Sequence, residues 1–176
     1  MPITRLNNNS ITSVTALPSG VGGKILQVAH AESNSPISST SNIPLDDSVP
    51  TSTEGVQILS QSFTPVSSTS SLYFFCTVYC NEDINAGDNI ALPIFKGTTF
   101  IGMGYKHQTG SPSGDNWVSI TFTIKHNPAS TSTQTYTLRG GINNGTFESL
   151  NTASYMQNSR YGSNIKNTMT IMEIEN

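Results

Sequence analysis

Residues 116–126, NWVSITFTIKH, alternate strictly between two kinds of side chain. In a β-strand successive side chains point to opposite faces, so such a pattern predicts a strand with one face in a core and one in water. The predicted core face carries Val118, Ile120, Phe122 and Ile124, and the other carries Trp117, Ser119, Thr121 and Thr123. A helix would mix these two sets, so this segment favours a β fold.

Similar short segments recur along the 176 residues, separated by turn signals. We expect strands at 24–31, 56–65, 72–80, 90–95, 99–107, 135–142 and 167–174 in addition to 117–126. Ser, Thr and Asn exceed a third of the chain, and these residues do poorly inside helices. Eight or more short strands without a convincing helix predict an all-β sandwich or barrel.

The segment 33–55 differs from its surroundings because it contains Pro36, Pro44 and Pro50. Proline cannot donate to a ladder of hydrogen bonds, so no central strand is expected there. We interpret the segment as an irregular surface loop with short edge pairings at most. The strand at 72–80 is apolar on both faces, which predicts a central strand covered on each side.

Charge limits the partners of the chain. The net charge is −3, and the eight Lys and Arg residues are scattered without a cluster, which argues against nucleic acid. No apolar run reaches the roughly 18 residues of a membrane span, and the first residues lack the pattern of a secretory signal. We expect a soluble protein made in a cytoplasm, with no membrane insertion.

Cys76 and Cys80 lie four residues apart in one predicted strand. At about 3.3 Å per residue their Cα atoms are too far apart for the roughly 4.4–6.8 Å that a disulfide needs. We therefore expect both to be buried, unpaired thiols. A metal pair is the alternative, but no further ligand stands nearby in the sequence.

Catalytic and phosphate-binding motifs are not met. LPSGVGGKI (17–25) resembles a P-loop, but Pro18 stands where the motif needs its first glycine and Ile25 where it needs Ser or Thr. GSPSG (110–114) resembles a nucleophile elbow, but Pro112 stands where that motif needs serine. His30, His107 and His126 are widely separated. We predict no enzyme activity, no cofactor and no metal.

The segment 82–88 is acidic and contains Glu82, Asp83 and Asp88. We interpret it as a plain turn, and a calcium site is the alternative.

One group of residues is suited to contact a ligand on the surface. The predicted strand end at 99–107 and the turn that follows it bring together Tyr105, His107, Asp115, Asn116 and Trp117. Aromatic rings in exposed positions can stack on the apolar face of a sugar. We treat this group as a candidate receptor site, with ordinary packing of Trp117 as the alternative.

The opening stretch, ITRLNNNSITSVTALPSG (3–20), is apolar only at wide intervals. Such a stretch is too polar to fold alone, so we expect either a segment that orders against other chains or a disordered tail. The apolar positions available for contact are Ile3, Leu6, Ile11, Val14 and Leu17.

Several phrases together resemble bacteriophage fibre-type structural proteins. They are this opening stretch, GGKILQV, ILSQSFTPVSSTSSLYFF (58–75), ALPIFKGTTFIG and the closing NTMTIMEI (167–174). Within them, 62–72 is similar to the family's S-x-T-P-S-S-T-S-S-K-I-L-V, with Leu72 in place of the usual Lys, and 168–174 to S-T-I-T-I-M-E-I. The 33–55 loop is longer than this family leads us to expect.

The resemblance implies a short attachment stem, residues 1–22, and a trimeric jelly-roll head similar to the tumour-necrosis-factor fold, residues 23–176. It implies a virion protein of a phage, a fibre or spike module that projects from the particle and contacts a host-surface glycan or protein. The stem would join other virion proteins or the two other chains of a homotrimer. The alternatives are a capsid-attached head-fibre or decoration protein without a receptor role and, less favoured, a carbohydrate-active enzyme.

Overall fold

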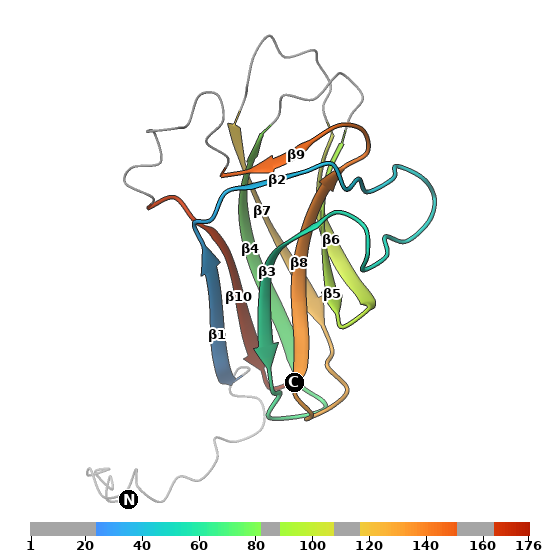
Figure 1. Ribbon diagram of the computed structural model, residues 1–176. Helices are drawn as coiled ribbons and strands as arrows, with labels where there is room; N and C mark the ends of the chain where they lie inside the picture. Colours follow the sequence, from blue (N-terminus) through green and yellow to red (C-terminus); the bar gives the residue numbers. More distant parts are fainter. Residues whose placement is uncertain (1–23, 82–88, 108–116, 151–163) are drawn as a thin grey trace, which may run out of the picture.

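The computed structural model describes residues 24–81, 89–107, 117–150 and 164–176, and these residues form two packed antiparallel sheets (Figure 1). The predicted stem and the residues Glu82, Asp83 and Asp88 lie outside the described residues. The strands are β1 (Ile25–Ser33), β2 (Ile37–Ser39), β3 (Val56–Phe63), β4 (Ser71–Asn81), β5 (Asn89–Lys96), β6 (Thr99–His107), β7 (Trp117–His126), β8 (Gln134–Ile142), β9 (Phe147–Ser149) and β10 (Asn167–Ile174).

The strand order is that of a jelly roll. One sheet has the order β1-β10-β4, and β7 pairs with the other side of β4; the short strands β9 and β2 lie at the end of this sheet. The second sheet has the order β3-β8-β5-β6. The chain passes from one sheet to the other after β2, β3, β4, β6, β7 and β8. Apart from the short β2 and β9, the strands form an eight-stranded, double-sheet jelly roll. The predicted all-β jelly-roll sandwich is confirmed.

The strand positions follow the sequence pattern closely. Each strand predicted from alternation appears within two residues of its expected ends. The proline-containing segment holds only the three-residue β2 and no central strand, as expected. It runs beside β5 and β6 on the outer side of the second sheet (Figure 1).

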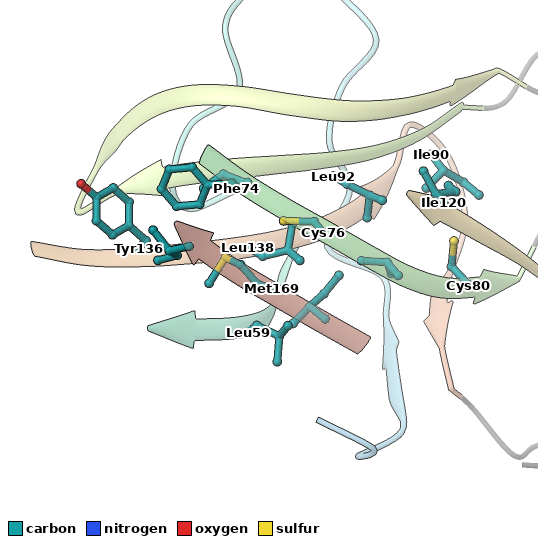
Figure 2. Close-up of a cluster of buried hydrophobic side chains, with 14 of the residues drawn as sticks. Leu59, Phe74, Cys76, Cys80, Ile90, Leu92, Ile120, Tyr136, Leu138 and Met169 are labelled. Carbon is teal, nitrogen blue, oxygen red and sulfur yellow. The ribbon is translucent and has the colours of Figure 1, made fainter. Parts of the chain in front are cut away.

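The core lies between the two sheets (Figure 2). Phe74 on β4 is fully buried, and its ring centroid lies 5.0 Å from that of Tyr136 on β8. Cys76 and Cys80 are buried and free, as predicted. Burial raises the pKa of each thiol to about 12, so both behave as small apolar side chains.

The expectation that β4 is covered on both faces is correct for its inner face only. Phe75, on the outer face, is 43% exposed, and its neighbours Tyr73 and Tyr79 are half-buried. Nothing among the described residues packs over this side of β4 as the second sheet packs over the other. The two apolar faces of the strand therefore have different surroundings.

Glu173 on β10 is a fully buried carboxylate at the end of the sandwich where β3 leads into β4. It accepts hydrogen bonds from the backbone N–H groups of Val66 (2.9 Å) and Ser67 (3.1 Å) and from the Ser70 hydroxyl (2.6 Å). Gln27 on β1 donates a further bond of 2.6 Å. The carboxylate thus joins β1, β10 and the turn before β4.

The hydrogen bonds decide the ionisation of Glu173. Burial alone would raise the pKa of this carboxyl, but the bonds from Ser70, Val66, Gln27 and Ser67 outweigh it and hold the pKa below its ordinary value. The ionised form is therefore the form that the fold stabilises. The same contacts join 62–72 to 168–174, the two phrases on which the resemblance rests most.

Phe74→Ala is expected to lower the free energy of unfolding by about 3–5 kcal/mol, because it leaves a cavity between the sheets. Phe75→Ala, one residue along the same strand, removes the same side chain from an exposed site and is expected to cost much less. Denaturant unfolding of the two variants measures the difference. Equal losses would show that the core is not where we place it.

Glu173→Gln is expected to destabilise the fold at pH 7 by at least about 1.5 kcal/mol, the contribution of one hydrogen bond to a charged group. Since the folded pKa lies below the ordinary 4.5, the wild type has this stability above about pH 4.5 and loses it as the pH falls through the folded pKa. Unfolding measured between neutral and acid pH should show a shallower loss in Glu173→Gln. Glu175→Gln, at an exposed carboxylate, is the control and should keep the wild-type slope.

Candidate functional site

A pocket of about 260 Å³ lies between the 40–55 segment and the outer face of β5 and β6. The sheet side contributes Ala91, Met103 and Tyr105, together with Asn89 and, just after β8, Asn143. The segment contributes the remaining lining residues, which are Ile43, Pro44, Leu45, Asp46, Ser48 and Pro50. The unusually long loop therefore forms one wall of a concave site.

Hydrogen bonds at both ends hold the segment against the sheet. The Ile43 N–H donates to the Ile142 carbonyl at 3.0 Å, and the Ile43 side chain is buried. At the other end the Arg139 guanidinium donates to the carbonyls of Glu54 and Gly55, both at 2.7 Å. A segment fixed in this way can act as a preformed wall.

Gly55 is required where the segment joins β3. Its φ of +62° is a left-handed conformation that favours glycine, and an added Cβ would lie 2.5 Å from the Gly140 carbonyl oxygen. The close approach of Gly55 to β8 is what allows the segment to fold back over the sheet.

Asn89 organises the polar side of the pocket. Its side-chain Oδ1 accepts hydrogen bonds from the Tyr105 hydroxyl and from Nδ1 of His107, the latter at 2.7 Å in the tautomer that places the proton there. The Asn89 N–H in turn donates to the Asn143 side chain at 2.6 Å. Tyr105 is 49% exposed although its hydroxyl is bound, so the ring is held in place with much of its surface open to solvent.

Asp46 supplies the negative charge of the pocket. Its Oδ1 accepts bonds from the Ser48 hydroxyl at 2.5 Å and from the Ser48 N–H at 2.8 Å. These two bonds lower the pKa of the Asp46 carboxyl, so it is ionised at neutral pH. No Lys, Arg or His lines the pocket among the described residues.

The structure brings together two of the residues proposed from sequence as a receptor site. Tyr105 and His107 meet at Asn89, whereas Trp117 begins β7 in the other sheet, opposite Asn81. Asp115 and Asn116 lie outside the described residues, as do the proposed stem contacts Ile3, Leu6, Ile11, Val14 and Leu17.

Sequence reasoning did not find the rest of the pocket. Asn89 and Asn143 belong to strand ends 54 residues apart, and only the pairing of β5 with β8 brings them together. Asp46 had a local signal, because Asp followed two residues later by Ser is typical of a side-chain-capped turn. The proline-rich composition of the segment indicated a loop but not the surface that the loop covers.

A second feature is the outer face of the β1-β10-β4-β7 sheet. Cross-strand pairs place Val28 beside Met172, Met172 beside Tyr73, and Thr170 beside Phe75. Val28 is 53% exposed and Phe75 43% exposed. We call this cluster the apolar patch, and it consists of Ile25, Val28, Tyr73, Phe75, Met172 and Ile174.

Polar side chains surround the apolar patch on the same face. The Lys125 ammonium lies 5.9 Å from the centre of the Tyr73 ring, and the Thr77 and Thr121 hydroxyls are 3.1 Å apart. His30 bonds the Thr170 hydroxyl at 2.8 Å. An apolar cluster with a polar border on an open sheet face is typical of a protein–protein contact surface.

In the part of the chain that the structure describes, no three His, Cys, Asp or Glu side chains gather in a way that could hold a metal ion. No helix there is long and apolar enough to cross a membrane.

Searches with family models and among curated proteins find no match to this sequence. Among solved structures, the VP2 subviral particle of infectious bursal disease virus is similar to 84% of this chain at 10% identity and a TM-score of 0.39. A structure of the Gx strain of the same virus is similar to 98% of the chain at 11% identity and a TM-score of 0.41.

These similar structures come from virus particles, and the chain spans 39% and 42% of their respective lengths. TM-scores of 0.39 and 0.41 are too low to assign the chain to a family or a function. The jelly-roll assignment therefore rests on the strand order and register of the chain itself.

Gly55→Ala is expected to destabilise the protein by more than the roughly 1–2 kcal/mol of a left-handed alanine, because its methyl group would also contact Gly140 and Ile43. Gly97→Ala is the matched control, since Gly97 has a similar φ of +56° with open space around it. Thermal unfolding gives the difference, and cleavage after Glu54 by a glutamyl endopeptidase should be faster in Gly55→Ala only. Equal stability and equal cleavage would contradict the docked segment.

Proposed function

We propose that this chain is a structural module of a virus particle, a trimeric jelly-roll head carried on an N-terminal attachment segment. In this proposal residues 1–22 attach to the particle and residues 23–176 project from it as a fibre or spike that contacts the host surface. The apolar patch is the observation that carries the proposal, because it gives the chain a surface suited to other copies of itself.

The occupant that we propose for the apolar patch is the next copy of the chain in a homotrimer. Most oligomers of a single chain are closed and symmetric, so each copy would contribute the same surface around the axis. The patch includes Ile25 at the start of β1, the strand that directly follows the proposed attachment segment. One axis can therefore serve both the segment and the head.

The sequence resemblance supports a particle protein in particular. Its two best-matching phrases are held together by the buried Glu173 carboxylate, so they form one structural unit at the end of the sandwich. A fold alone does not determine function, so the proposal has to be tested on assembly itself.

Light scattering of the full-length protein is expected to give three times the mass of one chain. Phe75→Asp introduces a charge into the apolar patch and is expected to shift the protein to monomers with an unchanged circular dichroism spectrum. Ser119→Asp, at an exposed position on the same face, is the matched control and should remain trimeric.

Leu6→Asp is expected to weaken attachment to particles while leaving the head folded, and incorporation into particles measures this. A monomeric wild type would contradict the trimer. A head that adheres to no host cell, combined with attachment through residues 1–22, would replace the fibre role with that of a decoration protein.

A further inference from the structure

The pocket between the 40–55 segment and the β5-β6 pair has both apolar and polar lining. Its apolar lining includes Ile43, Ala91 and Met103, and its polar lining is formed by Asp46, Ser48, Asn89 and Asn143. A pyranose sugar has the same division, with C–H groups on its faces and hydroxyl groups around its edge. We propose that this pocket binds a single neutral sugar ring, with Tyr105 as the surface on which the ring stacks.

Tyr105 is suited to this role because its ring is both open and fixed. The residue is 49% exposed, and its hydroxyl donates to Asn89, which His107 also contacts. A ring that is already held in position loses little conformational freedom when a ligand stacks on it. The aromatic face provides apolar contact, and the Asp46 carboxylate provides a partner for hydroxyl groups.

The charge of the pocket selects against acidic ligands. Asp46 is ionised and no basic side chain lines the pocket among the described residues, so a sulfate, a phosphate or an acidic sugar would meet this negative charge without a basic side chain of the lining to offset it. A neutral polyol instead donates its hydroxyl groups to the carboxylate. A ligand ammonium group is the competing occupant, since it would pair with Asp46 and lie on the Tyr105 ring.

The size of the pocket limits the ligand to one ring. Its volume of about 260 Å³ lies just below the range of roughly 300–1,000 Å³ for sites that enclose drug-sized molecules. A terminal sugar of a surface glycan can enter with the rest of the glycan outside. This inference rests on the proposed host contact and gives it a chemical class, but it does not depend on the trimer.

Saturation-transfer NMR of the full-length protein with methyl glucoside, methyl galactoside and methyl N-acetylglucosaminide tests the proposal. We expect at least one of these to bind, with glucuronic acid binding more weakly. Tyr105→Ala should weaken the binding by roughly two- to tenfold, the usual range for one aromatic contact. Tyr105→Phe, which keeps the ring, should weaken it less.

Asp46→Asn should also weaken binding, because it removes the charged acceptor without changing the shape of the pocket. Val49→Ala is the control, since Val49 is an exposed residue of the same segment that does not line the pocket. Each variant should have the melting temperature of the wild type, which verifies that the substitution leaves the fold intact.

Three results would overturn the proposal: no binding of any neutral glycoside, binding that Tyr105→Ala leaves unchanged, or glucosamine binding in place of the neutral sugars, which would make the pocket a site for cations. None of these results would alter the mass measured by light scattering. Failure of the sugar site is therefore distinguishable from failure of the trimer.

Discussion

The buried carboxylate of Glu173 is the contact on which the arrangement of the first sheet depends. An unpaired charge in this position would be strongly destabilising, so the surrounding groups have to supply hydrogen bonds. They come from β1 through Gln27 and from the turn before β4 through Val66, Ser67 and Ser70. Because β10 pairs with both β1 and β4, one carboxylate sets the position of three neighbouring strands at the same end of the sandwich.

The two faces of β4 would let one strand serve both folding and the proposed assembly. Phe74, Cys76, Val78 and Cys80 fill the space between the sheets, while Phe75 and its neighbours form an apolar patch on the outside. A continuous apolar run predicts a strand covered on both sides, and within one chain only one side is covered. The proposed trimer would supply the missing cover, which reconciles the sequence pattern with the exposed aromatic side chain.

The pocket shows how an irregular segment becomes part of a rigid site. Prolines and a left-handed glycine keep residues 40–55 out of the sheets. Two hydrogen bonds hold the segment against β8, one from Arg139 to the Gly55 carbonyl and one from the Ile43 N–H to the Ile142 carbonyl. The polar groups at Asn89 come from strand ends, where backbone pairing is ending and side chains are free to bond one another. Loops held on a β scaffold in this way commonly carry binding sites.

The sequence by itself determined the fold class, the strand positions, the buried free cysteines and the lack of a central strand between β1 and β3. These features depend on alternation, proline chemistry and strand geometry, all of which act over a few residues. Only the tertiary structure decided the strand order, the burial of Glu173, the single covered face of β4, and the meeting of Tyr105 and His107 with Asn89. The first three depend on residues far apart in the chain, and local patterns carry no information on which distant strand becomes a neighbour. The last depends on the register of the β5-β6 hairpin, which pairs Asn89 with His107.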